Sequence, residues 1–341
     1  MKNFVLLGAA GFVAPRHMRA IRDTGNSLVA AMDKHDAVGV IDSYFPESAF
    51  FVEFERLDRH VEKLKRMGDE KKVHYVSIAS PNYLHDAHIR FALRVGTDAI
   101  CEKPLVLNPW NIDALKEIEQ ESGKKVNTVL QLRHHPSIIS LKQKVDSNTS
   151  PLTPDSSRSS APHPSPLASN APRPKYDIDL TYITSRGRWY LVSWKGDLAK
   201  SGGLATNIGI HFFDMLQWIF GGVQSNIVHI SEPTKAAGYL ELEKARIRWF
   251  LSIDSNDLPA VARNAGKTTY RSITIDQQEL EFSEGFADLH TVTYQEILKG
   301  NGFGLEDVKP SIEMAFEIRN AKPVGLKGEY HPFLKAVKSE G

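Results

Sequence analysis

Apolar and polar positions in the first 130 residues follow two alternating patterns. Short apolar runs, typical of strands buried in a parallel sheet, are separated by longer stretches with apolar residues at helical spacing. The runs predict strands at 4–7, 28–32, 73–79, 99–101 and 126–130, and the stretches between them predict helices at 16–23, 53–67, 83–95 and 110–122. Strands that alternate with helices form a parallel sheet covered on both faces. We therefore expect an N-terminal α/β domain with a doubly wound parallel sheet.

The pattern changes after this part. Residues 146–174 consist mainly of Ser, Pro, Ala and Asn with almost no large apolar side chain, so we expect a disordered insertion there. Period-two alternation at 177–194, 245–253 and 270–282 predicts antiparallel strands, and helices are predicted near 204–219 and 288–299. We expect a second, α+β domain with an open, mostly antiparallel sheet. The first domain is expected to cover 1–125 and the second 126–341.

Composition narrows the class of protein. In the 341 residues, 42 Lys and Arg nearly balance 41 Asp and Glu, so a formal charge of +1 gives no electrostatic reason to expect nucleic acid or a membrane as partner. Cys101 is the only cysteine, which excludes an intramolecular disulfide and a cysteine-based metal cluster. No apolar segment is long enough to cross a bilayer, and we interpret the run at 4–7 as a strand rather than a signal peptide. We expect a cytoplasmic protein.

The stretch FVLLGAAGFVAPRH (4–17) combines a predicted strand, a glycine turn and the start of a helix. Glycine is needed where a Cβ would clash with a closely approaching backbone or pyrophosphate. Gly8, Gly11 and Ala14 give G-x-x-G-x-x-A in place of the usual G-x-G-x-x-G, which corresponds to a loop with one extra residue. By itself this pattern fits a cofactor loop and a tight strand-to-helix turn equally well.

Asp33 favours the first interpretation. It ends the next predicted strand about 20 residues after the glycines, where a carboxylate accepts hydrogen bonds from the adenosine ribose hydroxyls. A solvated Asp in a turn is the alternative, but strand, loop, helix, strand and acid together favour a dinucleotide site. The carboxylate would repel the 2′-phosphate of NADP, so NAD is the expected cofactor, although Lys34 and His35 adjoin Asp33.

Three further motifs follow predicted strands or a glycine turn. ASPNYLH (79–85) and CEKPL (101–105) lie at the carboxyl ends of predicted parallel strands, where such sheets hold their ligands. In SGGLATNIGIHFFD (201–214), Asn207 and His211 are four residues apart and share one helix face. Taken singly, the Glu-Lys-Pro motif fits a surface turn and the histidine fits a structural role. An Asn–His pair just after a glycine turn is more suggestive of a site.

In this order the motifs resemble those of the Gfo/Idh/MocA family of sugar and polyol dehydrogenases, over nearly the whole chain except 146–174. The resemblance implies an N-terminal Rossmann domain and a C-terminal open-faced α/β domain. QLRHHP (131–136), LTYITSRGRWYLVSWKGD (180–197) and ADLH (287–290) are similar to the bacterial UDP-N-acetyl-2-amino-2-deoxyglucuronate dehydrogenases of this family. That branch implies NAD-dependent oxidation of the 3-hydroxyl of UDP-N-acetylglucosaminuronic acid (UDP-GlcNAcA) to the 3-keto sugar. The product leads to the diacetamido uronic acids of lipopolysaccharide O-antigen.

The resemblance also implies roles for residues. Lys103 matches the lysine near the reacting carbinol, His211 matches the acid/base histidine, and Asn207 stands where many members have Asp. Which of Lys103 and His211 is the base stays open, since a buried neutral lysine and a histidine both suit that role. The expected cofactor-binding residues are Gly8, Gly11, Phe12, Val13, Asp33, Ser80, Asn82, His85, Glu102, Lys103 and Gln131. The expected substrate-binding residues are Asn207, Arg133, Arg188, Tyr190 and Lys195.

Cationic side chains and histidines are the candidates for anion and metal binding. A substrate with a diphosphate and a carboxylate needs cations, which Arg133, Arg188 and Lys195 would supply together with Arg186; an exposed surface charge is the alternative for each.

We expect no metal. Adjacent histidines point in different directions along a chain, and the helix face that carries the other candidate histidines lacks a carboxylate or thiol partner. The histidines concerned are His134, His135, His85 and His88.

The resemblance extends to partners and leaves two other functions open. Some relatives recycle bound NADH with 2-oxoglutarate, and a homodimer or homotetramer is expected. Another sugar or polyol dehydrogenase, for example one resembling inositol dehydrogenase, is the first alternative. The second is a non-catalytic NAD-binding regulatory protein whose site is disabled by the insertion at 146–174.

Overall fold

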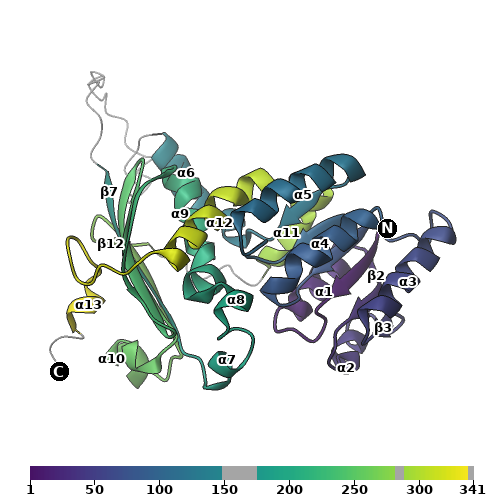
Figure 1. Cartoon of the computed structure of the whole chain (residues 1–341), viewed down its shortest axis with the longest axis horizontal. Coiled ribbons are helices and arrows are strands. Elements are labelled where there is room, and N and C mark those ends of the chain that lie inside the picture. The colour runs from purple at the N-terminus through teal and green to yellow at the C-terminus, as the bar shows by residue number, and fades with distance from the viewer. Residues whose placement is uncertain (148–174, 281–287, 337–341) are drawn as a thin grey trace, which may run out of the picture. The chain divides into compact units, whose positions relative to one another are not determined.

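The structure, a computed structural model, describes residues 1–147, 175–280 and 288–336 (Figure 1). The chain forms two compact units, each assembled from three segments. The first contains the described residues within Met1–His135, Arg186–Met215 and Glu284–Ala321, and the second those within Pro136–Ser185, Leu216–Ser283 and Lys322–Gly341. Residues from both halves of the sequence therefore meet inside the first unit.

The first unit contains a six-stranded parallel sheet in the order β3-β2-β1-β4-β5-β6. Its strands are β1 (Asn3–Leu7), β2 (Ser27–Met32), β3 (Ala49–Phe51), β4 (Tyr75–Ile78), β5 (Asp98–Cys101) and β6 (Val126–Thr128). The order is that of the doubly wound Rossmann fold, which confirms the predicted fold class. β3 was not predicted, because three residues are too few to show a period. β6, which the expected boundary at residue 125 left in the second domain, is the edge strand of this sheet.

The described helices of the first unit that pack on this sheet are α1 (Ala14–Asp23), α2 (Val38–Asp42), α3 (Phe54–Arg66), α4 (His85–Arg94), α5 (Pro109–Ser122), α11 (Leu289–Leu298) and α12 (Leu305–Asn320). Two further short helices of this unit are α7 (Trp189–Val192) and α8 (Leu198–Ser201). Short turns of other helix types are η1 (Asn82–Leu84), η2 (Gln131–His134) and η3 (Ala205–Gly209), and η3 runs into α9 (Ile210–Phe220). The helices predicted in the first 130 residues are present. α12 was not predicted, because Pro310 lies inside it and interrupts the helical pattern.

The core lies on both faces of the sheet. Alternate residues of β1 point to opposite faces, so Val5 and Leu7 join one hydrophobic cluster with residues of α3, α4, α5 and α12. Phe4 and Leu6 join a second cluster with residues of α1, α2 and α11. All four side chains have 0% exposure, as expected for a parallel strand covered on both faces.

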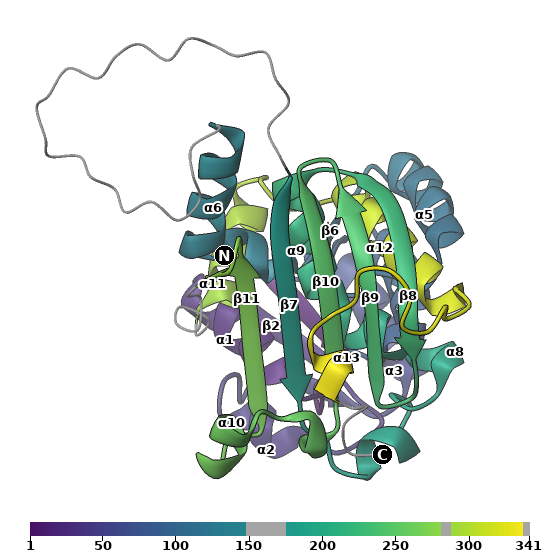
Figure 2. The same cartoon turned by 90° about the vertical axis from the view of Figure 1, so that its left-hand side faces the viewer.

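The second unit contains a six-stranded sheet in the order β12-β11-β7-β10-β9-β8 (Figure 2). Its strands are β7 (Tyr176–Thr184), β8 (Val223–Ser231), β9 (Lys235–Leu242), β10 (Ala245–Ser252), β11 (Thr269–Ile275) and β12 (Gln278–Glu279). Only β7 and β10 pair in parallel among these described strands, so the predicted mostly antiparallel sheet is confirmed. The strand predicted at 177–194 was too long: β7 ends at Thr184, and the aromatic residues after the Ser-Arg-Gly turn form α7 instead.

The helices of the second unit are α6 (Pro136–Asp146), α10 (Ala260–Asn264) and α13 (Phe333–Ala336), with a short turn η4 (Ser255–Asp257). Asp146, predicted to begin the disordered insertion, is instead the last residue of α6, where it pairs with Lys142 and Lys244. The rest of that prediction, from residue 148 to 174, lies outside the described residues, as do residues 281–282 of the last predicted strand. Among the described helices, none combines the length and apolar character needed to cross a membrane.

Candidate active site

The glycine turn after β1 is held against the end of β4. Gly8 has φ 87°, and a Cβ at this position would lie 2.5 Å from the Ser80 amide nitrogen and 2.6 Å from the Ala79 carbonyl oxygen. A Cβ on Gly11 would lie 3.0 Å from the Gly8 carbonyl oxygen, which accepts a hydrogen bond from the Gly11 amide. A side chain at Gly8 would therefore displace backbone at the end of β4 and carry a positive φ.

The turn leads into α1, which begins directly after Val13 and beside the exposed Phe12. Amides at a helix N-terminus bind phosphate groups. Asp33 follows β2 beside the same turn: its Oδ2 accepts from the Ala10 amide at 3.1 Å and its Oδ1 from the His35 amide at 3.0 Å. A carboxylate oxygen that accepts one hydrogen bond can still accept another from a ribose hydroxyl. The turn, the helix N-terminus and the carboxylate therefore fit a dinucleotide.

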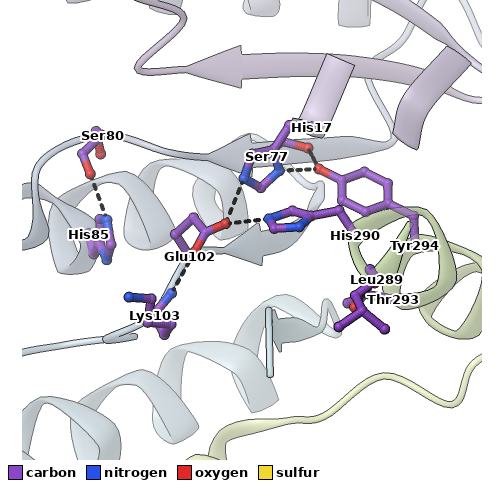
Figure 3. Close-up of polar contacts among 10 residues, drawn as sticks. All are labelled: His17, Ser77, Ser80, His85, Glu102, Lys103, Leu289, His290, Thr293 and Tyr294. Atoms are coloured by element: carbon purple, nitrogen blue, oxygen red, sulfur yellow. Dashed lines mark hydrogen bonds and ion pairs between the residues drawn. The ribbon is translucent and has the colours of Figure 1, made fainter. Parts of the chain in front are cut away.

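His85 joins the loops that follow β4 and β5. Its Nε2 lies 2.8 Å from the Ser80 carbonyl oxygen (Figure 3), and its Nδ1 lies 2.7 Å from the Pro104 carbonyl oxygen. The ring is 1% exposed, and burial lowers the pKa of His85. A neutral ring donates to only one of these two carbonyls, and its contacts favour a role in holding the loops after β4 and β5; cofactor binding by His85 stays a prediction. The Ser80 hydroxyl forms a hydrogen bond with Nδ1 of a second buried histidine, His88, at 2.9 Å.

Lys103 follows β5, and its side chain contacts a residue from the second half of the sequence. Its Nζ donates a hydrogen bond to the backbone carbonyl of Asn207 at 3.3 Å. Burial lowers the pKa of Lys103; the Glu102 carboxylate opposes this effect, and the charges of Arg186 and Arg16 reinforce it. Lys103 is therefore closer to neutrality than an exposed lysine at the same pH.

Asn207 brings several of the predicted site residues together. It lies in η3 (Ala205–Gly209), a π-helical turn of the kind that is frequent at functional sites. Its Nδ2 donates to the Tyr190 hydroxyl at 2.6 Å, and its Oδ1 accepts from Asn82 Nδ2 at 3.2 Å. The Asn207 carbonyl also accepts a hydrogen bond from Lys103. Asn207 therefore connects the three loops that carry Asn82, Lys103 and Tyr190, and it does so with uncharged amide and carbonyl groups.

His211 and Gln131 lie on elements of the same unit. His211 is the second residue of α9, four positions after Asn207, and is half-buried. Gln131 begins η2 just after β6, at the carboxyl edge of the parallel sheet, and is also half-buried. This edge is where open α/β sheets hold their ligands.

Arg133, which was expected to bind the substrate, forms a buried ion pair with Asp214. Its Nε and Nη2 donate to the two carboxylate oxygens of Asp214 at 2.9 and 2.8 Å, and Nη2 also donates to the Asp307 carbonyl at 2.9 Å. Arg133 is 7% exposed and Asp214 3%. A buried, bidentate arginine already neutralised by a carboxylate is a poor partner for an incoming anion. We interpret these contacts as favouring a structural role for Arg133; substrate binding by Arg133 stays a prediction.

The remaining predicted cations lie in the segment that carries α7. Arg188 is exposed and its guanidinium lies 4.8 Å from the centre of the Trp189 ring. Lys195 is half-buried; burial lowers its pKa, and the charge of Arg186 adds to this effect. Arg186 acts in the same way on the pKa of Lys103, so these three cations lie close enough for Arg186 to repel both lysines. Such a cluster favours an anion as ligand.

The sequence did not predict a buried hydrogen-bonded cluster around Glu102 (Figure 3). Glu102 Oε1 lies 3.1 Å from His17 Nε2 and 2.9 Å from His290 Nε2. His17 Nδ1 lies 2.7 Å from the Tyr294 hydroxyl, which lies 2.7 Å from the Ser77 hydroxyl. The only signal in the sequence was the ADLH motif that contains His290, because pairing between positions 17, 102 and 290 follows no local spacing.

The same cluster contains three groups that could bind a metal ion. One ligand atom from each of His17, Glu102 and His290 lies within 4.8 Å of the other two. The contacts from both histidines to Glu102 are hydrogen bonds of ordinary length, however, and His17 has a second partner in Tyr294. These groups satisfy one another. We assign the cluster to hydrogen bonding and assign no metal to it.

Two family models match the chain. Residues 2–129 match the Gfo/Idh/MocA oxidoreductase family, NAD-binding Rossmann fold, and residues 175–266 match the C-terminal alpha/beta domain of the same family. With a Rossmann sheet, a glycine turn against β4 and an acid after β2, the chain belongs to the Gfo/Idh/MocA oxidoreductases. The family suggested by the motifs is thereby confirmed.

Solved structures show which members of the family this chain resembles. The WlbA (WbpB) dehydrogenase of Thermus thermophilus is 48% identical, covers 98% of this chain and 100% of its own, and superposes with a TM-score of 0.87. That protein was solved with NAD and alpha-ketoglutarate, and with NAD and UDP-GlcNAcA. The WlbA dehydrogenase of Bordetella pertussis, solved with NADH and UDP-GlcNAcA, is 16% identical over 96% of this chain and 99% of its own, with a TM-score of 0.69; this likeness concerns the fold alone.

A curated relative is more distant. The putative oxidoreductase YteT of Bacillus subtilis is 24% identical over 226 residues, which are 65% of this chain. The match spans only 47% of the length of YteT.

Proposed function

We propose that this protein is an NAD-dependent dehydrogenase that oxidises the 3-hydroxyl of UDP-GlcNAcA to the 3-keto sugar. One observation carries the proposal: the chain is 48% identical, over 98% of its length, to a dehydrogenase solved with NAD and UDP-GlcNAcA. The structure supports it through the contact of Lys103 with Asn207, which brings the expected lysine to the segment that carries His211. The product would feed the synthesis of diacetamido uronic acids for lipopolysaccharide O-antigen.

The residues of the first unit would hold the cofactor in a simple way. The turn at Gly8 and Gly11 and the N-terminus of α1 would bind the pyrophosphate, and Asp33 would accept hydrogen bonds from the adenosine ribose. A carboxylate at Asp33 disfavours the 2′-phosphate of NADP, so NAD is the proposed cofactor. When bound, NAD supplies the acceptor for the hydride that leaves C3 of the sugar.

Lys103 and His211 are the proposed acid/base groups at the 3-hydroxyl. A general base works best when its pKa lies near the working pH. Burial moves the pKa of Lys103 in that direction, which supports Lys103 as the group that removes the hydroxyl proton. His211, one helical turn from Asn207, is the group that would relay the proton or replace Lys103 in this role.

Arg186 and Lys195, together with Arg188, are the proposed partners of the substrate's negative groups. The repulsion between Arg186 and the lysines is relieved when an anion binds among them. The same positive region suits the two carboxylates of 2-oxoglutarate. We propose that 2-oxoglutarate reoxidises bound NADH and is itself reduced to 2-hydroxyglutarate, because the related Thermus protein was solved with NAD and alpha-ketoglutarate.

NADH absorbance tests the proposal. UDP-GlcNAcA and UDP-N-acetylglucosamine are compared side by side, with and without 2-oxoglutarate, and product is measured by chromatography in case NADH stays bound. We expect product from the uronate and at most a trace from the uncharged sugar. Turnover of a free sugar or of inositol alone would favour another dehydrogenase of the family. Normal NAD affinity without turnover would favour a regulatory protein. A cytoplasmic location and a homodimer or homotetramer remain parts of the proposal.

A further inference from the structure

The buried cluster around Glu102 has a defined direction of hydrogen bonding. An ionised carboxylate only accepts, so His17 and His290 must each carry a hydrogen on Nε2 to bond Glu102 Oε1. Burial lowers the pKa of His17, although Glu102 opposes this, and a neutral ring leaves a lone pair on Nδ1. That lone pair accepts from the Tyr294 hydroxyl, which keeps its proton because burial raises the pKa of Tyr294.

The cluster is built from several separate elements of the first unit. His17 comes from α1, directly behind the glycine turn, and Ser77 from β4, where its hydroxyl contacts that of Tyr294 at 2.7 Å. His290 and Tyr294 come from α11, four residues apart on one helix face. Both histidines meet at Glu102, the residue next to Lys103 (Figure 3). The cluster therefore fixes the Lys103 backbone to the helix that begins at the phosphate-binding turn.

Glu102 also contacts Lys103 directly. Its Oε2 accepts a hydrogen bond from the Lys103 amide at 3.3 Å, while Oε1 is held by the two histidines. The carboxylate is 7% exposed, so without donors it would take up a proton. Although burial raises the pKa of Glu102, hydrogen bonds from His17 and His290 bring it well below the usual range.

We propose that His17 and His290 are positioning residues for Lys103: by donating to Glu102 Oε1 they keep an oriented negative charge behind the lysine and fix its backbone. This proposal rests on the proposed function only in giving Lys103 a role at the substrate. Both histidines contact Glu102 Oε1. Their effect reaches Lys103 through Glu102.

The ionisable groups that face this pair come from several elements. Around Glu102 they are His17 from α1, His85 from α4, Cys101, Lys103, and His290 and Tyr294 from α11; around Lys103 they also include Arg16 and Arg186. Both arginines lower the pKa of Lys103, and Glu102 is the group among these that raises it. Removal of its charge must therefore shift the lysine toward neutrality.

The titration of Lys103 tests the proposal independently of turnover. Protein labelled with 13C and 15N in lysine is titrated by NMR, and the Lys103 signal is the one that Lys103→Met removes. Glu102→Gln should lower the Lys103 midpoint by about one pH unit, the shift expected for a lost opposite charge at close range. The pH profile of turnover should move to lower pH by the same amount. An unchanged Lys103 midpoint in Glu102→Gln would overturn the proposal.

His290 provides the matched pair of variants. Gln at this position retains an N–H donor near the place of Nε2, whereas Leu has none. We expect His290→Gln to stay within about threefold of wild-type turnover, and His290→Leu to lose about tenfold, in line with the loss of one hydrogen bond to a charged group. Equal loss in both variants, with wild-type Lys103 titration, would show a structural role only and overturn the proposal.

Two outcomes separate this inference from the proposed function. If UDP-GlcNAcA is not a substrate but Glu102→Gln still shifts the Lys103 midpoint, the inference stands and the substrate assignment fails. His331→Gln serves as the control for loss of a buried histidine, because His331 lies in the second unit, where Nε2 contacts Thr181. It should leave the Lys103 titration unchanged. If His331→Gln shifted the Lys103 midpoint as much as Glu102→Gln does, the inference would also be overturned.

Discussion

Lys103 Nζ lies 3.3 Å from the backbone carbonyl oxygen of Asn207, a residue 104 positions further along the chain. The contact joins the loop after β5 to the π-helical turn before α9. It brings together two motifs that the sequence could only place separately, and it is made within one compact unit. The proposed acid/base groups, Lys103 and His211, therefore come from the two halves of the chain.

Replacing the proposed acid/base groups should strongly lower turnover while NAD still binds. We expect Lys103→Met and His211→Asn each to lower turnover by a factor of about 100 or more, the usual contribution of a positioned acid or base. NAD affinity, measured by protein fluorescence, should change by less than about threefold, because the proposed pyrophosphate site lies at Gly8 and Gly11. Near-normal turnover in both variants would remove these residues from the mechanism.

Two glycines with positive φ in the first part of the chain make a matched test of the cofactor turn. Gly8 has φ 87°, and a Cβ there would lie 2.5 Å from the nearest backbone atom, whereas Gly25 has φ 72° and nothing within 4 Å of that position. Gly25→Ala should cost about 1 kcal/mol of stability and leave NAD binding intact. Gly8→Ala should cost about 3 kcal/mol and weaken NAD binding by more than tenfold. Equal effects on NAD affinity would contradict the assignment of the turn.

Asp33 should determine which dinucleotide is preferred. Asp33→Ser removes the carboxylate that accepts from the ribose hydroxyls and the charge that repels a 2′-phosphate. We expect the KM for NAD to rise by about tenfold and the ratio of NADP to NAD efficiency to rise by at least as much. Steady-state kinetics with both cofactors measure this ratio. An unchanged ratio would mean that Asp33 does not face the ribose.

The buried ion pair between Arg133 and Asp214 leads to a stability prediction. Arg133→Met leaves Asp214 buried and unpaired, so we expect a loss of about 3 to 5 kcal/mol in the free energy of unfolding. The double change Arg133→Met with Asp214→Leu should regain most of it. Chemical denaturation gives both values. A large rise in the KM for substrate with unchanged stability would instead restore Arg133 to the substrate site.

Stability should fall on mild acidification because buried histidines resist protonation. Burial lowers the pKa of His88 from 6.5 to about 4 and that of His331 from 6.5 to about 3. Below pH 6.5 the unfolded chain binds protons that the folded chain does not, so the stability present above pH 6.5 is lost toward pH 4. Each histidine contributes about 1.4 kcal/mol for each pH unit in this window. His331→Asn should make the free energy of unfolding, measured by denaturation, depend less steeply on pH. An unchanged slope would show that burial of His331 is not the cause of the pH dependence.

The sequence was sufficient for the fold class because short apolar runs and helical spacing are local patterns. It missed β9, and it missed β8, which carries register shifts that interrupt its alternation. It extended the first strand of the second domain too far, because Trp189 and Tyr190 have high strand propensity but fold into α7.

The candidate site was predicted only where a motif was contiguous. Gly8, Asp33, Lys103 and Asn207 lie in recognisable stretches, and the structure brings the last two into contact. The expected role for Arg133 came from its place after β6, and its ion pair with Asp214, 81 positions away, could not be predicted from local sequence. The pairing of His17 with Tyr294 was missed for the same reason, because a buried contact over 277 positions has no local signature.

The path of the hydride tests the central claim most directly. UDP-GlcNAcA carrying deuterium at C3 is incubated with the enzyme and NAD, and then with 2-oxoglutarate, and the products are analysed by mass spectrometry. The proposed function predicts deuterium in the reduced nicotinamide and then in 2-hydroxyglutarate, and its loss from the 3-keto sugar. Full retention of deuterium in a turned-over sugar, or no turnover of UDP-GlcNAcA at all, would contradict it.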